Sequence, residues 1–214
     1  MNKKNQRLPE THIKSVFALY SNGQIQEALD SVETLTKDYP DEPLLYNIRG
    51  ACYKEIGQLE KAFKNFEKAV SLKPDYTEAL YNLGITLREL GQVDAAIRCY
   101  EEALTIKHAY PNVHNNLGSI FLELSQLDDA VDHFEWAVAY KPEFDIAHNN
   151  LGSTLLALGQ VDAAVESYEK ALAVNPDYAE AHNNLGIAFH RLGQLDAAVE
   201  SYEKALAINP DYPE

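Results

Sequence analysis

The feature that most constrains this chain is an internal repeat, because the sequence matches itself when it is shifted by 34 residues. Two alanine columns, an aromatic column and a closing proline share this period, and the final segments 145–178 and 179–212 differ at few positions. A fixed period of 20 to 50 residues is typical of folds that stack identical small units on one another. The clearest column is glycine, at Gly50, Gly84, Gly118, Gly152 and Gly186.

Each 34-residue segment has the pattern of two amphipathic helices. In 179–212, the segments AEAHNNLGIAFHRL and LDAAVESYEKALAI are separated by GQ and followed by NPDY. Gly193 is placed to end the first helix, and Pro210 cannot continue the second. The stretches DYTE at 75–78 and DYAE at 177–180 predict a capping box at the start of the helix that opens the following repeat. The chain is therefore expected to be all-α.

The glycine column lies inside the first helix, where glycine costs about 1 kcal/mol relative to alanine. Repeat positions are numbered here from 1 to 34, with residue 179 as position 1, so the glycine is at position 8. A cost that recurs five times indicates a close approach between helices. The alanines at positions 20 and 27 would serve the same purpose in the second helix.

Composition limits the partners and the compartment. The formal net charge is −15 and the pI is near 4.8, so nucleic acid and anionic membranes would be repelled. Cys52 and Cys99 form no CxxC pair, and the opening residues MNKKNQRLPE lack the apolar run that a signal peptide needs. No apolar stretch approaches the length of a membrane span. We expect a cytoplasmic protein with no nucleic-acid or membrane partner.

Leu-Gly at positions 7 and 8, Ala at 20, an aromatic at 24, Ala at 27 and Pro at 32 resemble the tetratricopeptide repeat (TPR). The resemblance implies a right-handed superhelical solenoid of about six helix-turn-helix repeats. We expect a tail at 1–8, a degenerate first repeat at 9–42, and regular repeats at 43–76, 77–110, 111–144, 145–178 and 179–212.

Three places depart from the regular pattern. Val16 replaces the glycine of the first repeat, and His108 stands in the proline position of the third. The chain ends with DYPE, which resembles the sequence before the first helix of earlier repeats. Residues 213–214 are therefore expected to begin a truncated or missing helix. This predicts either a longer parent protein or an uncovered last face that could join a second copy.

Adjacent asparagines recur in the first helices, as in AHNNLG at 147–152 and 181–186. The helical wheel places positions 5 and 6 opposite the packing side, in the concave groove that a TPR superhelix implies. An asparagine amide has one acceptor and two donors, so it can bind the main chain of an extended peptide. The expected peptide-binding residues are Asn82, Asn116, Asn150 and Asn184, flanked by Tyr81, Asn115, Asn149 and Asn183, with Arg88, His190 and Arg191 adding selectivity.

The asparagine pattern is also similar to the ladder in the TPR arm of O-linked N-acetylglucosamine transferase. That resemblance implies a substrate-presenting arm of a larger enzyme, such as a glycosyltransferase. Alternatively, the asparagines bond neighbouring turns within the stack. Lys and Arg are too sparse in this groove to grip a C-terminal carboxylate as chaperone-binding TPRs do.

Candidates for chemistry are weak. His114, His148 and His182 recur at position 4, on the packing side, where successive repeats are too far apart to share a zinc ion. Trp136 and the periodic tyrosines are expected to pack between helices. No nucleophile, phosphate-loop or metalloprotease motif occurs. We therefore expect a protein-interaction scaffold with no catalytic residue, metal or cofactor.

Overall fold

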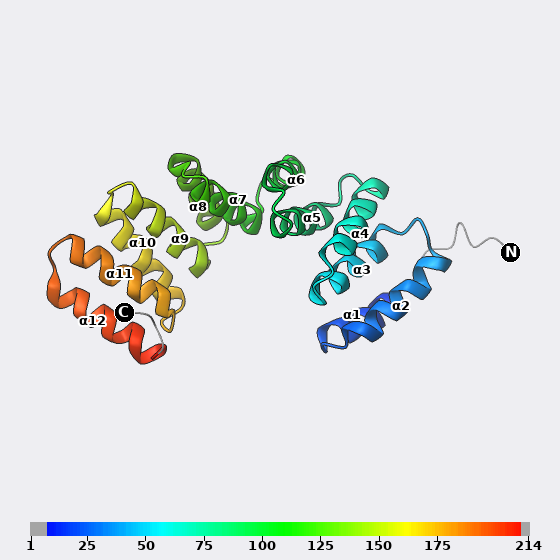
Figure 1. Ribbon diagram of the computed structural model, residues 1–214, viewed down its shortest axis with the longest axis horizontal. Coiled ribbons are helices and arrows are strands. Elements are labelled where there is room, and N and C mark those ends of the chain that lie inside the picture. Colours follow the sequence, from blue (N-terminus) through cyan, green and yellow to red (C-terminus); the bar gives the residue numbers. More distant parts are fainter. Residues whose placement is uncertain (1–7, 211–214) are drawn as a thin grey trace. The chain divides into compact units, whose positions relative to one another are not determined.

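The computed structural model describes residues 8–210, and this part of the chain forms twelve α-helices and no strand (Figure 1). The chain divides into two compact units, Met1–His108 and Ala109–Glu214. The first unit contains α1 (Glu10–Ser21), α2 (Ile25–Asp38), α3 (Pro43–Glu55), α4 (Leu59–Leu72), α5 (Thr77–Glu89) and α6 (Val93–Ile106). The second contains α7 (Pro111–Glu123), α8 (Leu127–Tyr140), α9 (Asp145–Ala157), α10 (Val161–Val174), α11 (Ala179–Arg191) and α12 (Leu195–Ile208).

Within each unit, consecutive helices pair into hairpins, and the second helix of one hairpin packs on the first helix of the next. In the second unit, for example, α9 packs on α10 and α10 packs on α11. One helix pair occupies each predicted 34-residue range. The all-α fold class predicted from the sequence is confirmed. Residues 1–7 of the predicted tail at 1–8 and the predicted helix start at 213–214 lie outside the described residues. Leu8, the last residue of that tail, is instead 5% exposed and belongs to the hydrophobic core.

Glycine ends most of the first helices of the hairpins. Gly193 has a φ of +73°, and its backbone N–H donates to His190 O, while Gln194 N–H donates to Phe189 O. This pair of bonds satisfies the last carbonyls of the helix, so the predicted role of Gly193 is confirmed. Ser125 takes the same left-handed conformation, with a φ of 59°, where the other repeats have glycine.

The start of the first helices differs from the expected capping box. Tyr76 is the N-cap of α5 and Tyr178 is the N-cap of α11, and neither cap has a side-chain hydrogen bond. The capping-box prediction is therefore wrong: the helices begin two residues later than Asp75 and Asp177, which lie in the preceding turns. Pro111, which follows the irregular His108, is the first residue of α7, where proline is well tolerated.

The mid-helix glycines allow the second helix of the hairpin to pack closely on the first, as the helix-propensity cost of glycine indicated. A Cβ built at Gly152 would lie 2.7 Å from Cε1 of Tyr168, whose ring is only 1% exposed. The column of glycines thus pairs with the column of aromatic residues at position 24 in the second helix. The contacts are Gly50 with Phe66, Gly84 with Tyr100, Gly118 with Phe134, Gly152 with Tyr168, and Gly186 with Tyr202.

The two alanine columns complete the core of the five regular hairpins. Ala164 and Ala171, at positions 20 and 27 of one repeat, are fully buried. Small side chains there let neighbouring helices approach closely, as the sequence predicted. Within residues 8–210, no helix has the length and apolar character needed to cross a bilayer.

Candidate functional site

The paired asparagines connect the first helices of successive hairpins. Asn150 Nδ2 on α9 donates to Asn115 Oδ1 on α7 at 3.1 Å, and Asn184 Nδ2 on α11 donates to Asn149 Oδ1 on α9 at 3.1 Å. In the first unit, Asn82 Nδ2 makes the same bond to Asn47 Oδ1 at 3.0 Å. In each case, position 6 of one repeat donates to position 5 of the repeat before it.

Burial separates the two asparagine positions. At position 5, Asn149 is 1% exposed and Asn115 is 9% exposed. Asn149 also donates to Glu180 Oε1 at 3.1 Å, and Asn47 donates to the hydroxyl of Tyr76 at 3.4 Å. The expectation that position 5 lies on the open face is therefore wrong for Asn115 and Asn149, whose side chains lie between the first helices. Asn183 is half-buried.

Three of the asparagines at position 6 keep polar groups available after making this bond. Asn82, Asn150 and Asn184 are all half-buried, and each uses one of its two side-chain N–H groups. Within residues 8–210, their Oδ1 atoms accept no hydrogen bond. Each therefore offers one acceptor and one donor. Asn116 and Tyr81 are also half-buried and each has an interaction of its own.

Charged residues on the same helices also link one hairpin to the next. Lys54 on α3 pairs with Glu89 on α5 at 3.1 Å. Arg191 Nη1 on α11 donates to Leu156 O on α9 at 3.0 Å, so part of its guanidinium already binds the stack. His190 is exposed. Arg88, predicted with these two to select the ligand, is half-buried and engaged.

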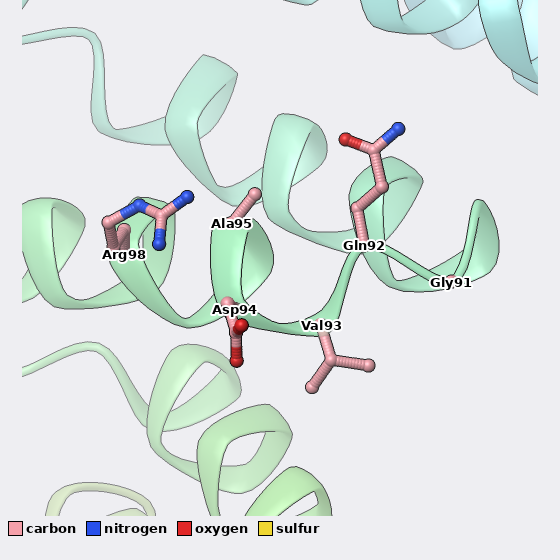
Figure 2. Close-up of a pocket in the computed structure, with 6 residues that line it drawn as sticks. All are labelled: Gly91, Gln92, Val93, Asp94, Ala95 and Arg98. Carbon is pink, nitrogen blue, oxygen red and sulfur yellow. The ribbon is translucent and has the colours of Figure 1, made fainter.

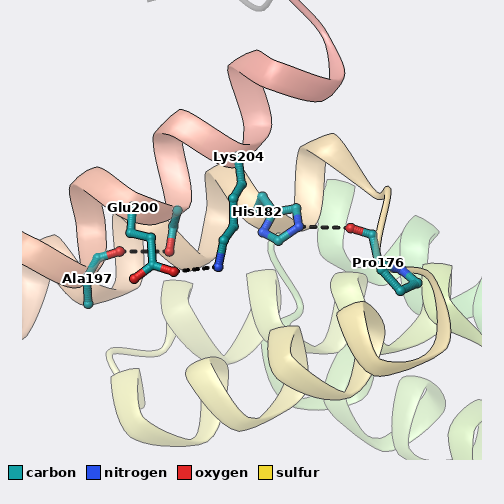
Figure 3. A network of polar contacts seen from close by, with 6 residues as sticks. Pro176, His182, Ala197, Glu200 and Lys204 are labelled. Carbon is teal, nitrogen blue, oxygen red and sulfur yellow. Dashed lines mark hydrogen bonds and ion pairs between the residues drawn. The ribbon is translucent and has the colours of Figure 1, made fainter.

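The histidines at position 4 have structural partners. His148 Nε2 lies 2.9 Å from Pro142 O, and His182 Nε2 lies 2.9 Å from Pro176 O (Figure 3). A carbonyl only accepts, so Nε2 carries the proton in both rings. Nearby in Figure 3, Lys204 pairs with Glu200 at 2.6 Å on α12. Within residues 8–210, no three His, Cys, Asp or Glu side chains are placed to hold a metal ion.

An aromatic cluster in the hairpin of α7 and α8 was missed by the sequence reasoning. His114 Nδ1 lies 3.1 Å from His133 Nδ1, and the His114 ring also approaches Tyr140 and Trp136. Trp136 stacks on Tyr140 with ring centroids 5.5 Å apart, and 51% of its surface is exposed. Trp136 therefore contacts α7 through His114, as the expected packing between helices requires, but half of its surface stays uncovered. The available signal was that positions 23 and 26 lose their period at His133 and Trp136.

The pKa values of the two cysteine thiols do not favour a nucleophilic thiolate. Burial raises the pKa of the Cys52 and Cys99 thiols to about 11, so both remain protonated. Burial, reinforced by His114, lowers the pKa of His133. A shallow hollow of about 370 Å³ lies at the turn into α6 (Figure 2). Its lining includes one acidic and one basic side chain, Asp94 and Arg98, but no thiol, hydroxyl or imidazole.

Comparisons with known proteins agree on one family. A tetratricopeptide repeat model matches residues 41–109 and 75–143, and a second model of the same description matches 150–213. Comparison with curated sequences gave no match.

Three solved structures show the similarity of the fold. A MamA structure is 25% identical, with a TM-score of 0.70, and the match covers 75% of this chain and 94% of that one. YrrB, described as a TPR protein with an unusual peptide-binding site, is 22% identical with a TM-score of 0.70, covering 85% and 93%. Cut9, in the APC/C Cut9–Hcn1 hetero-tetramer, is 19% identical with a TM-score of 0.78, covering 94% and 40%.

Proposed function

The chain belongs to the tetratricopeptide repeat family, and from this premise we propose that it is a non-catalytic scaffold that binds an extended peptide along its first helices. The contacting groups are the position-6 asparagines, Asn82 in the first unit and Asn116, Asn150 and Asn184 in the second. The asparagines at position 5 act mainly beneath them, as the acceptors that hold the position-6 amides in place.

The observation that carries this proposal is the free half of three position-6 amides, those of Asn82, Asn150 and Asn184. Asn150 and Asn184 are each oriented by one hydrogen bond to the preceding repeat, yet retain an unbonded Oδ1 and a second N–H. An orientated amide loses little side-chain entropy when a ligand binds. One acceptor and one donor match the N–H and C=O of a peptide bond, so recognition would not depend on the peptide's side chains.

Other residues would add selectivity at the edges. Tyr81 and Asn183 are half-buried neighbours at position 5, and Arg88, Arg191 and the exposed His190 lie at the ends of their helices. YrrB, which shares this fold, is a TPR protein with a peptide-binding site, and that precedent supports the proposal. The alternative, a substrate-presenting arm of a larger enzyme such as a glycosyltransferase, rests on the resemblance of the asparagine pattern alone.

The test compares two variants that break the same inter-repeat bonds. The first replaces position 6 (Asn82, Asn116, Asn150 and Asn184→Ala), which removes both the bonds and the exposed amides. The second replaces position 5 (Asn47, Asn115, Asn149 and Asn183→Ala), which removes the same bonds and leaves the position-6 amides. Binding of a random peptide library is measured below the unfolding temperature of each variant.

We expect the position-6 variant to lose captured peptides and the position-5 variant to retain most of them. Equal loss in both variants would mean that the bonds, and not the exposed amides, matter. Unchanged binding in the position-6 variant would place the peptide elsewhere.

A second candidate function, self-assembly through the C-terminal end, is favoured by the exposure of α12. Leu195 is 58% exposed and Val199 is 55% exposed, whereas the equivalent Val161 and Val165 of α10 are half-buried beneath α11. A second copy packed there would continue the stack. Sedimentation at increasing concentration should show a larger species that Val199→Lys abolishes. A monomer at all concentrations would rule this candidate out.

A further inference from the structure

A hollow recurs at the same place in the first two hairpins of the first unit. In the first hairpin it has a volume of about 450 Å³, and in the second about 470 Å³. Both lie between the two helices of a hairpin, lined from repeat positions 4 and 7 of the first helix and 23 and 26 of the second. We call this the side hollow. In the first hairpin its lining is His12, Ser15, Asp30, Ser31, Thr34 and Leu35; in the second it is Tyr46, Arg49, Tyr53, Lys61, Lys64, Asn65 and Lys68.

The side hollow of the second hairpin is basic. It gathers four of the 18 Lys and Arg residues of a chain whose net charge is −15. No carboxylate lines it, whereas Asp30 lines the hollow of the first hairpin, which has no Lys or Arg. The three lysines lie on one face of α4, are exposed, and form no ion pair with any residue in 8–210.

Contacts with neighbouring residues of the hollow hold the Arg49 side chain in place. Arg49 lies over the ring of Tyr46, 5.1 Å from its centroid, and its Nε donates to Asn65 Oδ1. Asn65 is 6% exposed and is itself fixed by donating to Lys61 O at 2.7 Å. Since Nε alone is used, both terminal amino groups of Arg49 remain available, and a guanidinium held in place binds a carboxylate at a lower entropic cost.

Tyr53 forms a second aromatic part of the lining of this hollow. Lys61 Nζ lies over its ring, 5.2 Å from the centroid, and its hydroxyl donates to Glu33 Oε1 at 2.8 Å. The hydroxyl is thereby turned towards α2, and the ring faces the lysine. The Tyr46 ring covers one side of Arg49 and the Tyr53 ring covers one side of Lys61. An aromatic ring displaces water there, which strengthens the attraction of these two cations to an anion.

We propose that the side hollow of the second hairpin binds an acidic segment of a protein partner, whose carboxylates pair with Arg49, Lys64 and Lys68. The charge of the hollow is opposite to that of the whole chain, so an acidic segment would be repelled elsewhere and attracted here. This site is separate from the asparagine surface, because positions 4, 7 and 11 of α3 lie on the other side of that helix from positions 5 and 6. It does not rest on the peptide-binding proposal.

The test uses a fluorescein-labelled decaglutamate peptide and measures its anisotropy at about 50 mM salt. One variant reverses two charges in the hollow, Lys64→Glu with Lys68→Glu. The control, Lys170→Glu with Lys204→Glu, makes the same change in net charge at position 26 of two other repeats. Both pairs of lysines are on the second helices of their hairpins.

We expect the hollow variant to weaken binding by at least about 10-fold, which corresponds to about 1.4 kcal/mol, and the control by less than about 2-fold. Equal weakening in both variants would show that only net charge matters and would overturn the proposal, as would a wild-type protein that does not bind decaglutamate.

Two further readouts separate other anions. Inorganic phosphate that displaces decaglutamate at micromolar concentration would assign the hollow to a phosphate group instead. Concentration-dependent self-association that only the hollow variant abolishes would assign it to the acidic surface of a second copy. Either result would overturn the proposed partner, whereas displacement only at millimolar phosphate and a monomeric protein agree with it.

Discussion

The contact between Gly152 and Tyr168 predicts that adding one methyl group destabilises this protein. On propensity alone, Gly152→Ala in the middle of α9 should stabilise by about 1 kcal/mol. The new Cβ, however, would lie 2.7 Å from Cε1 and 2.8 Å from Cδ1 of Tyr168. The ring is 1% exposed and its hydroxyl donates to Ser153 Oγ at 3.2 Å, so it cannot move away freely.

The net magnitude follows from three contributions. Inserting a group into a packed core costs about 1–3 kcal/mol, and losing the Tyr168 hydrogen bond costs about 1 kcal/mol. Subtracting the gain in helix propensity leaves a destabilisation of about 1–3 kcal/mol. For a chain of this length, each kcal/mol lowers the unfolding midpoint by about 2–4 °C.

The matched control is Gly186→Ala. Its Cβ would meet Tyr202 Cε1 at 2.6 Å, but Tyr202 is half-buried and can swing towards solvent. We expect a change close to zero there. Thermal unfolding is followed by circular dichroism and by the fluorescence of Trp136, the single tryptophan of the chain. A Gly152→Ala protein more stable than wild type would refute the reasoning, and so would equal losses at both sites.

Three further predictions concern the second unit. Ser125→Gly should raise stability by about 1 kcal/mol, seen as a higher thermal midpoint, because Ser125 holds a left-handed φ of 59°. Asn149→Ala and Asn184→Ala should show a coupling of about 1 kcal/mol in a double-mutant cycle of denaturant unfolding, since they share a hydrogen bond at 3.1 Å; additive effects would contradict it. Burial lowers the pKa of His133, so the unfolded chain binds the proton more tightly, and stability should fall as pH drops below about 6.5. Thermal midpoints at pH 7.5 and 5.5 should converge in His133→Ser, whereas an unchanged pH dependence would exclude this histidine as the source.

Periodic residues made the fold predictable from the sequence. Gly152, Ala164 and Ala171 recur because the five regular hairpins need the same close contacts. The period therefore predicted both the helix pairs and their packing. Gly193 was predictable for the same reason: a backbone at φ +73° favours glycine. The 34-residue period and the small size of glycine and alanine thus predicted the same paired helices.

The candidate site was only half predictable. A helical wheel treats positions 5 and 6 as neighbours on one face and cannot tell which of them the next hairpin covers. Asn149 is buried because Asn184 and Glu180 of the next first helix both contact it. Asn150 contacts the preceding first helix through one N–H and stays half-buried. The capping box failed because Tyr76, and not Asp75, directly precedes the helix.

Residues that break the period should be the ones that distinguish this protein from other stacks of the same kind. Position 26 is Lys68 in the second repeat, Trp136 in the fourth and Lys170 in the fifth, although the surrounding backbone is alike. Residues required for stacking must recur, because each hairpin presents the same surface to its neighbour. A position that changes from a lysine to a half-exposed tryptophan is free of that requirement. The residue at this position can therefore change, as it does from Lys68 to Trp136, without loss of the stack.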